Sequence, residues 1–359
     1  MKKLTFVGDI FPGDELFTCG FGIRSKTDER SVKRWTKNFV DAVGEADYII
    51  GNLESPLIDD QDAKDKTFYG RPLFAELLKN SGVNILNIAN NHILEHGVGG
   101  IKKTIGILHG GNILTVGGIE KGHPEILSVE QNGMKICMAG FCDERVCSIE
   151  NPQCYASLEE AKILNTLEHM KALHPDIIIF IFHWGDEYVH IPTLEQRRLA
   201  YKLIDNGANL IVGHHPHVIQ PYEHYHNGHI IYSLGNFCFD DVQSDHFEKG
   251  MIAKVALKDK TIQDISFQGV LVQDMAYTEE LVKPMNHQDF ERYFSEINKR
   301  YAQLQQLPDD EYQKIYERMQ THSHKKERIL MRLSLAKKII DIRHRHKMQL
   351  LKNIKDYIL

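Results

Sequence analysis

The sequence predicts an α/β protein that carries a helical appendage at its C-terminal end. Over roughly the first 215 residues, short apolar runs rich in β-branched residues alternate with segments of helical periodicity, which is the order of an α/β fold. Strand-like runs joined by tight turns then follow up to about residue 273. Beyond about residue 285 the chain is polar and its pattern is helical. We therefore expect one α/β domain over residues 1–275 and a helical region over residues 276–359.

The expected strands of the first part are near-continuous apolar runs, as in strands that are covered on both faces of a sheet. They are LTFVG (4–8), ADYIIG (46–51), VNILNIA (83–89), NILTVG (112–117), KICMAGF (135–141), DIIIFIF (176–182) and ANLIVG (208–213). Helical segments are expected between them, at residues 30–44, 71–82, 157–173 and 193–207. Ser157 and Thr193 open the last two segments and are expected to cap them.

The later part of the chain contains three strand-like runs and then helical patterns. The runs are HIIYSLGN (229–236), KGMIAKVALKD (249–259) and KTIQDISFQGVLVQ (260–273). Because tight turns join them, we expect an antiparallel extension of the sheet system. Helices are expected at residues 288–307, at 309–320 and from about residue 324 to the end.

The C-terminal end is basic although the whole chain is acidic. Residues 323–359 contain 11 Lys and Arg against 3 Asp and Glu, a net charge of +8, so residues 1–322 carry −14 and the whole chain −6. Ile329, Leu333, Ala336 and Ile340 recur at helical spacing among these charges. Such a helix could dock on its own domain, self-associate, pair with a partner, or lie on an anionic membrane surface.

Composition excludes several classes of protein. At 359 residues and 42% hydrophobic content the chain can bury a large core, which excludes a disordered or fibrous protein. The net charge of −6 argues against a nucleic-acid partner, because binding to phosphate backbones needs a clustered positive surface. The six cysteines lack zinc-ribbon spacing and are interpreted as reduced thiols. We see no signal-peptide core and no run of about 18 apolar residues, so we expect a soluble, cytoplasmic protein, at most peripheral to a membrane.

Polar side chains follow the ends of five expected strands. In open α/β sheets, ligands gather outside the carboxyl ends of the strands, so these side chains are expected to share one site. They are Asp9 after the first strand, Asn52 and Glu54 after the second, Asn90, Asn91 and His92 after the third, His183 after the sixth, and His214, His215 and His217 after the seventh. Carboxylate, amide and imidazole groups without thiolates suit Mn²⁺, Fe²⁺ or Zn²⁺. The sequence therefore predicts a site for one or two divalent metal ions.

The predicted site suggests a hydrolytic chemistry. Two divalent ions can activate water and stabilise the oxygens of a phosphoryl group. An imidazole beside them that is not a ligand can protonate the leaving group. His92 directly follows the expected ligand Asn91 and is assigned this role.

The polar motifs, in their order, resemble those of one known family. They are GD, GNLESP, ANNHxxxxG, FHWGDE, GHHPHVIQ and YSLGNF. This series is similar to the bacterial capsule-synthesis proteins associated with poly-γ-glutamate, a branch of the calcineurin-like metallophosphoesterases, over roughly residues 1–270. The resemblance implies a four-layer α/β/β/α sandwich, the metallo-dependent phosphatase-like fold, with a dinuclear metal site at the strand ends. It also implies a small-molecule or polymer substrate and capsule-synthesis proteins as partners.

The resemblance assigns roles to individual residues. The implied metal ligands are Asp9, Glu54, Asn91, His183, His215 and His217. His92 is the implied acid, oriented by Glu95, which stands where the wider superfamily usually has Asp. Phe11 replaces the His of an Asp-x-His motif and so removes one ligand. Asn52 and Glu54 stand where a bridging Asp is usual, and either of them could bridge.

The remaining candidates would contact substrate or support the ligands. They are Asn52, Arg71, Trp184, Glu187, His214 and Asn236. Arg71 could bind a substrate carboxylate or phosphate, or it could be a surface arginine. Trp184 and Tyr188 could line the pocket or belong to the core. Asn236 is expected to hydrogen-bond a ligand.

Three functions remain open at this point. The first is a metal-dependent hydrolase, most simply a phosphoesterase, in the synthesis or turnover of a capsule or cell-envelope polymer, either poly-γ-glutamate or a polysaccharide. The second is hydrolysis or transfer of γ-glutamyl or peptide amide bonds with the same metal-activated water. The third is a non-catalytic accessory protein, docked to a capsule synthase or to a membrane by its basic C-terminal helix.

Overall fold

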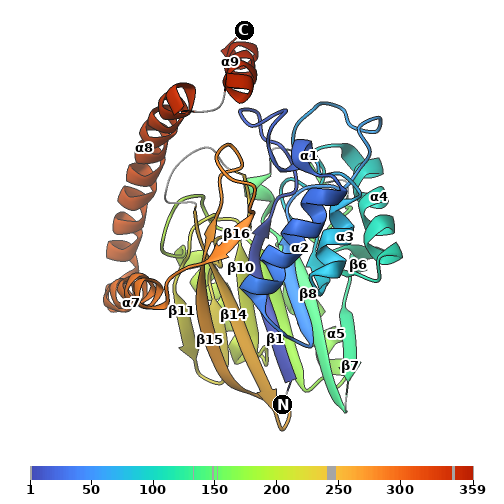
Figure 1. Ribbon diagram of the computed structural model, residues 1–359. Helices are drawn as coiled ribbons and strands as arrows, with labels where there is room; N and C mark the ends of the chain where they lie inside the picture. The colour runs from blue at the N-terminus through green and yellow to red at the C-terminus, as the bar shows by residue number, and fades with distance from the viewer. Residues whose placement is uncertain are drawn as a thin grey trace.

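Two β-sheets pack face to face, and helices cover their outer faces (Figure 1). This confirms the expected four-layer α/β/β/α sandwich with helices at the C-terminal end. The computed structural model describes residues 2–131, 133–147, 149–151, 153–240, 248–341 and 344–358.

The first sheet is built around strand β1. Its order is β16-β15-β14-β1-β2-β3-β4, and β13 also pairs with β1. The strands are β1 (Lys2–Ile10), β2 (Tyr48–Leu53), β3 (Val83–Asn87), β4 (Leu114–Val116), β13 (Asn236–Cys238), β14 (Lys249–Lys258), β15 (Thr261–Val272) and β16 (Val282–Pro284). Strands β1 to β4 run parallel, whereas β14 to β16 are antiparallel, as the runs joined by tight turns predict. Because β16 pairs with β15, this sheet continues past the expected domain boundary at residue 275.

The second sheet has the order β11-β12-β10-β9-β8-β7. Its strands are β7 (Leu127–Gln131), β8 (Met134–Cys142), β9 (Ile177–His183), β10 (Leu210–His214), β11 (Tyr222–Tyr225) and β12 (Gly228–Ile231), and a separate short hairpin joins β5 (Ile119–Glu120) to β6 (His123–Pro124). Strand β12 lies parallel to β10. The prediction that the run starting at His229 belongs to an antiparallel extension is therefore wrong for the pairing of β12 with β10. On its other side, β12 pairs antiparallel with β11.

Helices cover both outer faces. They are α1 (Ile23–Lys26), α2 (Glu29–Val43), α3 (Phe74–Asn80), α4 (Gly97–Gly110), η1 (Glu144–Val146), α5 (Glu160–Ala172) and α6 (Leu194–Asp205). Thr193 caps α6 as predicted, since its Oγ1 accepts a hydrogen bond of 3.0 Å from the backbone N of Gln196. The predicted cap at Ser157 is wrong. Ser157 forms a β-bridge with Cys142, so α5 begins only at Glu160.

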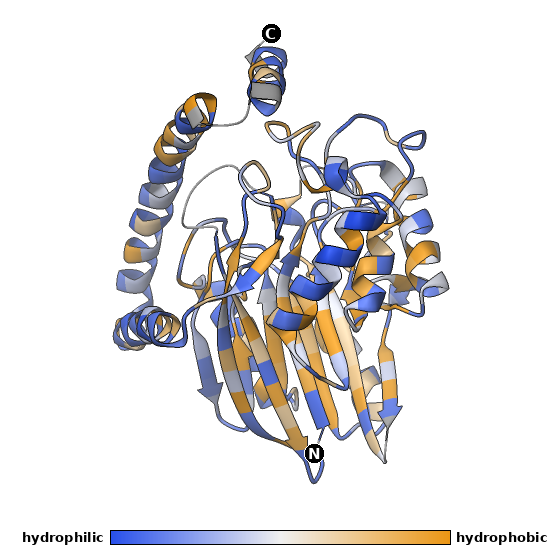
Figure 2. Ribbon diagram, in the orientation of Figure 1, coloured by the Kyte–Doolittle hydropathy of each residue, from blue (hydrophilic) through white to orange (hydrophobic). Residues whose placement is uncertain are grey.

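The near-continuous apolar runs bury both faces of the strands. In β9, Ile177, Ile179 and Ile181 pack into the core between the two sheets. Ile178, Phe180 and Phe182 alternate with them and pack into the core on the helix side. Because strand side chains alternate between the faces of a sheet, a strand covered twice needs apolar residues at every position. Figure 2 shows the contrast with α2, whose visible face is largely hydrophilic.

The C-terminal end forms α7 (His287–Leu304), α8 (Asp309–Asp341) and α9 (His344–Ile358). The predicted break near residue 320 is wrong, because the sequence from 309 to 341 contains no Gly or Pro to end a helix. Residues 342, 343 and 359, which fall in the predicted final helix, lie outside the described residues. No helix among the described residues is long and apolar enough to cross a bilayer.

Helices α8 and α9 dock on their own domain. The hydroxyl of Tyr312 donates a hydrogen bond of 2.6 Å to the carbonyl O of Pro192. Lys338, near the other end of α8, forms an ion pair with Asp274. In α9, Leu350 is fully buried against loops at the same edge of the molecule.

Candidate metal centre

The side chains predicted at the strand ends meet at one edge of the sandwich. Asp9 in β1 lies beside Asn52 in β2, and His183 at the end of β9 lies beside His214 at the end of β10. Glu54 follows β2 directly. All five side chains are buried. The carboxyl ends of strands from both sheets therefore place these polar side chains in one buried cluster.

A glycine precedes Asp9 because two backbone segments approach closely there. A Cβ atom on Gly8 would lie 2.0 Å from the carbonyl O of Gly235. The backbone N of Asp9 donates a hydrogen bond of 3.0 Å to that same oxygen. The Gly-Asp pair thus allows the close contact and fixes the carboxylate at the end of β1.

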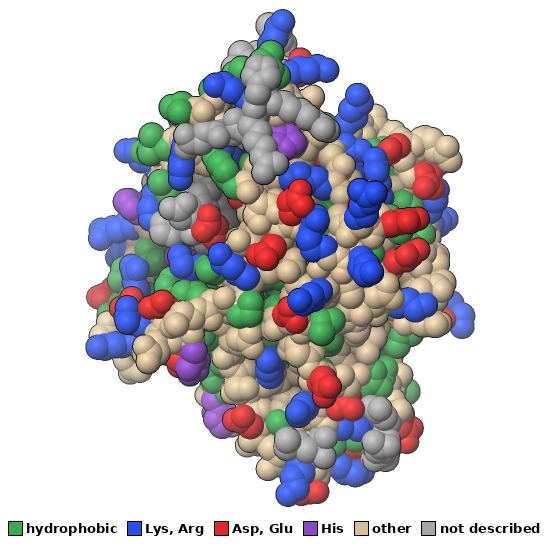
Figure 3. All heavy atoms as spheres, in the orientation of Figure 1, with side chains coloured by type: hydrophobic (Ala, Val, Ile, Leu, Met, Phe, Trp, Pro, Cys, Tyr) green, Lys and Arg blue, Asp and Glu red, His purple; other side chains and the backbone are tan. Residues whose placement is uncertain are grey.

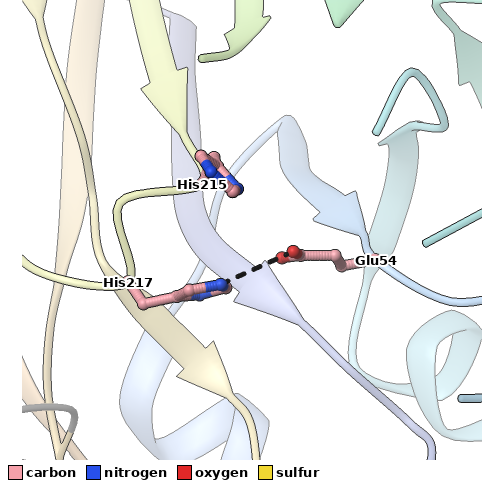
Figure 4. Close-up of side chains that lie close together, drawn as sticks. All are labelled: Glu54, His215 and His217. Atoms are coloured by element: carbon pink, nitrogen blue, oxygen red, sulfur yellow. Dashed lines mark ion pairs between the residues drawn. The ribbon is translucent and has the colours of Figure 1, made fainter. Parts of the chain in front are cut away.

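Two groups of potential ligands share one carboxylate. Glu54, His215 and His217 form one group, and Asp9, Glu54 and His183 form the other; within each group the ligand atoms lie within 4.8 Å of one another. Figure 4 shows Glu54 pointing toward His217, whose Nε2 lies 3.7 Å from Oε1 of Glu54. Glu54 belongs to both groups. Of the two residues that could bridge, the geometry favours Glu54 over Asn52.

The donor atoms of the centre fit divalent ions. Among the described residues, neither carboxylate oxygen of Glu54 has a hydrogen-bond partner, and the same holds for Nδ1 of His215. Each such buried atom costs about 1–3 kcal/mol, and more when it is charged. Burial and the nearby Asp9 carboxylate raise the pKa of Glu54 well above its ordinary value. A cation would pair with these atoms, and the mixed oxygen and nitrogen donors suit Mn²⁺, Fe²⁺ or Zn²⁺.

His183 and Asn91 lie together at the second group. Nε2 of His183 is 2.8 Å from Oδ1 of Asn91 and 3.5 Å from Oε1 of Glu54. Burial first, and then the neighbouring His215 and His214, lower the pKa of His183 well below its ordinary value. The ring is therefore neutral near neutral pH, which is the form in which imidazole binds a metal.

Three polar residues hold the expected ligands in place. Nδ2 of Asn52 donates a hydrogen bond of 2.9 Å to Oδ1 of Asp9, and Nδ1 of His214 lies 3.0 Å from the same oxygen. Oδ1 of Asn236 lies 2.9 Å from Nδ1 of His217, which is the contact expected for this residue. Burial acts to raise the pKa of Asp9, but His214, His217 and Asn52 together outweigh it, so the pKa lies below its ordinary value. Fixed partners of this kind set the orientation of metal ligands.

His92 is held by Glu95 as expected. Nδ1 of His92 lies 2.8 Å from Oε1 of Glu95, so the longer Glu side chain still reaches the ring. The two side chains are 20% and 21% exposed. The imidazole is thus oriented by a carboxylate and remains open to a substrate.

Aromatic rings surround Phe11, the residue at which the resemblance implies the loss of a ligand. Phe11 is fully buried and stacks on Phe239, with 4.8 Å between ring centroids. Phe68 stacks on His92, also at 4.8 Å, and meets Phe11 edge to face. Sequence reasoning missed Phe68 and Phe239, because an isolated aromatic residue in a loop carries no periodic signal. The three rings form an apolar wall that fixes the plane of the His92 ring.

Two expected substrate contacts lie away from the ligands. The Arg71 guanidinium donates a hydrogen bond of 3.2 Å to the carbonyl O of Thr27 and lies 3.6 Å from Asp60. Trp184 is 1% exposed, and its Nε1 donates a hydrogen bond of 3.0 Å to the carbonyl O of Tyr232. The structure therefore places Trp184 in the core outside the second sheet.

Glu187 lies close to the first group of ligands. Burial acts to raise the pKa of its carboxyl, but the charges of His215 and His217 outweigh this effect, and the pKa lies below its ordinary value. Glu187 is half-buried.

A cleft of about 580 Å³ opens between this edge and helix α8. Tyr188 and Val218, the residues that follow Glu187 and His217, form one wall. The opposite wall comes from α7 and α8 and includes Arg300, Arg318, His322 and Lys326. Sequence reasoning missed these four residues, because only the folded chain brings α7 and α8 next to the metal motifs.

Comparison with known proteins identifies relatives by sequence. The family model described as bacterial capsule synthesis protein PGA_cap matches residues 3–241. The chain is 33% identical to the capsule biosynthesis protein CapA of Bacillus anthracis over 251 residues, which cover 66% of this chain and 59% of that protein. It is also 33% identical to the PGA biosynthesis protein CapA of Bacillus subtilis strain 168 over 247 residues, 66% of this chain and 63% of that protein. The matched region thus spans about three fifths of these relatives.

A solved structure shares the fold. The crystal structure of a candidate 5′-nucleotidase from Staphylococcus aureus, in complex with α-ketoglutarate, matches with a TM-score of 0.50 and 13% identity, over 82% of this chain and 58% of that chain. At this identity the likeness shows the metallophosphatase-like fold alone. The family match covers more than half of the chain and includes all the strand-end motifs. On that basis, the chain belongs to the bacterial capsule synthesis protein family PGA_cap.

Proposed function

We propose that the protein is a metal-dependent hydrolase with phosphoesterase-like chemistry that acts in the synthesis or turnover of a capsule or cell-envelope polymer. The observation that carries this proposal is Glu54, a buried carboxylate without hydrogen-bond partners among the described residues that two groups of ligands share. A carboxylate common to two such groups suits a pair of cations held close together. Membership in the capsule-synthesis family supports a polymer as the substrate.

The ligand residues would be those that the strand ends bring together. They are Asp9, Glu54, Asn91, His183, His215 and His217. When bound, divalent ions supply positive charge that activates water and stabilises the oxygens of a phosphoryl group. Asn52, His214 and Asn236 keep the ligands in position through the contacts described above.

His92 would give its proton to the leaving group. Oε1 of Glu95 contacts Nδ1 of His92 at 2.8 Å, so Nε2 of His92 is the ring nitrogen that would face the substrate. The stacked ring of Phe68 restricts rotation of the imidazole. A proton donor held in this way typically contributes about 10²–10⁴-fold to the rate.

The cleft beside the centre suits an anionic chain. Three cationic side chains line it, Arg300, Arg318 and Lys326, against a single carboxylate among its lining residues, that of Glu327. Arginine binds carboxylates and phosphates through two parallel hydrogen bonds. A polymer with carboxylate or phosphate groups, cleaved at the metal centre, would continue into this cleft.

The double variant Arg300→Ala/Arg318→Ala is expected to raise the KM for an anionic polymer by about 10-fold or more, because each lost charge-assisted hydrogen bond contributes about 1.5–3 kcal/mol. Turnover of a small ester that does not reach the cleft should stay unchanged. Steady-state kinetics on both substrates measure this. Arg328→Ala/Arg332→Ala is the matched control, because both residues lie exposed on α8, the helix of Arg318, outside the cleft. Equal KM values for the two double variants would rule out the cleft as a polymer site.

The same cleft is also compatible with a substrate that contains amide bonds. A chain of γ-linked glutamates carries one carboxylate per residue, and activated water can attack an amide carbonyl as well as a phosphorus atom. Hydrolysis or transfer of γ-glutamyl bonds is therefore the second candidate. A third, an accessory role in a synthase complex, is consistent with the family and requires no turnover.

One experiment separates the three functions. The protein is purified without chelator, its metal content is measured by mass spectrometry, and Mn²⁺-supplemented samples are assayed on phosphomonoesters, phosphodiesters and a γ-glutamyl oligomer. The double variant His215→Ala/His217→Ala is run in parallel. Ester cleavage that disappears together with the metal supports the phosphoesterase. Amide cleavage alone supports the second candidate, and bound metal without turnover on any substrate supports the accessory role.

The outer face of α8 supports a peripheral membrane association. Ile329, Leu333 and Ile340 are 50%, 61% and 75% exposed. Figure 3 shows Lys and Arg side chains with hydrophobic ones between them along the edge formed by α8. A basic face with exposed apolar residues is typical of helices that lie on anionic bilayers.

Leu333→Glu/Ile340→Glu is expected to reduce binding to vesicles that contain phosphatidylglycerol, because it removes apolar contacts and adds negative charge. Co-sedimentation with these vesicles, compared with vesicles of phosphatidylcholine alone, measures the loss. Val40→Glu, at an exposed apolar position on α2, is the control. If the wild-type protein binds neither kind of vesicle, α8 has no membrane role.

A further inference from the structure

Two thiols lie close together just beyond the end of β8. Cys142 is the last residue of the strand, and Cys147 follows the short helix η1. Their Sγ atoms are 3.7 Å apart. All six cysteines of the chain are free thiols in the structure. A disulfide has an S–S distance of about 2.05 Å, so a small movement of the loop would bring these sulfurs to bonding distance.

The surroundings of Cys147 favour its reactivity. Its Sγ lies 3.0 Å from the hydroxyl of Tyr155. The contact with Cys142 first, and then that with Tyr155, lower the pKa of the Cys147 thiol, and burial only partly offsets this. By contrast, burial raises the pKa of Cys19 and Cys154, the other two cysteines that are not fully buried. Because the thiolate is the nucleophile, Cys147 is the thiol most prepared to react near neutral pH.

The loop between the two thiols is anchored at both ends. The backbone N of Cys142 donates a hydrogen bond of 2.9 Å to the carbonyl O of Ala156. Arg145 binds the carboxylate of Asp143 at 2.6 Å and Glu195 of α6 at 2.5 Å. These contacts keep Cys147 near Cys142, which is fully buried.

A cavity lies on the Tyr155 side of the pair. It has a volume of about 330 Å³, and Glu144, Tyr155 and Ser157 are among its lining residues. Cys147 is itself half-buried rather than enclosed. The partial exposure of Cys147 and the cavity beside its partner Tyr155 make it the member of the pair that a small oxidant would reach first.

We infer that Cys142 and Cys147 form a reversible oxidation site. A hydroperoxide is the oxidant, and the product is a disulfide between the two cysteines. The Cys147 thiolate attacks the peroxide, so an S–O bond forms and the O–O bond breaks, and the leaving oxygen takes up a proton as water or alcohol. The Cys142 sulfur then attacks the Cys147 sulfenic acid, so the S–S bond forms, the S–O bond breaks and water leaves. Both thiols are oxidised and the peroxide is reduced. This inference does not depend on the proposed hydrolase.

The test treats the full-length protein with hydrogen peroxide near neutral pH, alkylates the remaining thiols, and maps the digest by mass spectrometry. We expect two of the six thiols to become unreactive, a peptide pair joined through Cys142 and Cys147, and full recovery with a dithiol reductant. Tyr155→Phe removes one hydrogen bond to Cys147, so it should slow the oxidation while the same bond still forms.

Two variants keep the inference falsifiable. Cys147→Ser should abolish the paired loss of thiols, whereas Cys154→Ser, in the same half-buried region, should leave it unchanged. Circular dichroism confirms that each variant is folded before treatment. Overoxidation of Cys147 without a bond to Cys142, or a bond between Cys147 and Cys154, would overturn the assignment.

Discussion

Glu54→Gln is expected to abolish metal binding and turnover while stabilising the metal-free protein. Gln preserves the shape of the side chain but not its charge, so it removes the shared ligand and also the buried carboxylate that lacks a hydrogen-bond partner among the described residues. Loss of a residue that only supports a ligand lowers metal affinity by up to about 100-fold. Because Glu54 would itself be a ligand, its loss should lower the affinity by more than this. Metal content by mass spectrometry, with activity on the best substrate, measures the loss.

The stability gain of this variant has a defined dependence on pH. Because burial and Asp9 raise the pKa of Glu54 in the folded protein, the unfolded chain loses this proton at a lower pH than the folded one. The carboxyl thus adds no cost of burying a charge when it is protonated in both states, and this cost destabilises the chelated wild type as pH rises above the ordinary Glu pKa. Thermal unfolding of chelated samples should show the variant gaining stability over wild type as pH increases.

Glu125→Gln is the matched control for both effects. Burial also raises the pKa of Glu125, but this residue belongs to neither group of ligands. Its substitution should leave metal content and turnover unchanged. Wild-type metal content in Glu54→Gln would show that Glu54 is not a ligand, whatever the stability measurements give.

His92→Asn is expected to lower kcat by about 10²–10⁴-fold without loss of metal, because it removes the proton donor and not a ligand. The loss should be greatest for alkyl esters, whose leaving oxygen needs a proton, and smallest for nitrophenyl esters, whose leaving group departs as a stable anion. Kinetics on a series of esters with different leaving groups measure this dependence.

Two neighbouring variants calibrate the effect of His92→Asn. Glu95→Gln keeps a contact to the imidazole but removes the charge, so its loss in kcat should be smaller. His96→Asn is a structural control, because His96 binds the backbone of Lys64 and Thr67 at 2.9 Å each. A loss in His92→Asn that is the same for every leaving group would contradict a proton-donor role.

The position of the centre is largely predictable from the sequence, because its motifs are local. Each ligand candidate directly follows its own apolar run, so identifying the strand also locates the ligand. The choice between Asn52 and Glu54 as the shared group was not predictable. The two residues lie two positions apart at the end of β2, and the choice depends on which side chains of other strands each one contacts. Only the fold shows that the Asn52 amide is bound to Asp9 while Glu54 is left open.

The contacts of the C-terminal helices could not be predicted in the same way. Helical periodicity identifies the helices, but it does not show which surface they pack against. Arg300 and Arg318 therefore gave no signal, although the fold places them opposite Val218 in the cleft. For Arg71 the sequence left a substrate contact and a surface arginine open, and the fold adds its contacts with Thr27 and Asp60.

Helix α8 also has a consequence for how long the folded state lasts. Its first half contacts a loop of the second sheet, where the Tyr316 hydroxyl donates a hydrogen bond of 2.5 Å to Asp186, and its second half pairs Lys338 with Asp274 beyond the first sheet. Because α8 contacts loops of both sheets, we expect it to dock late in folding, after the two sheets have come together. Interactions that form after the transition state slow unfolding without accelerating folding. We therefore expect the docked helix to lower the rate at which the two sheets separate during unfolding.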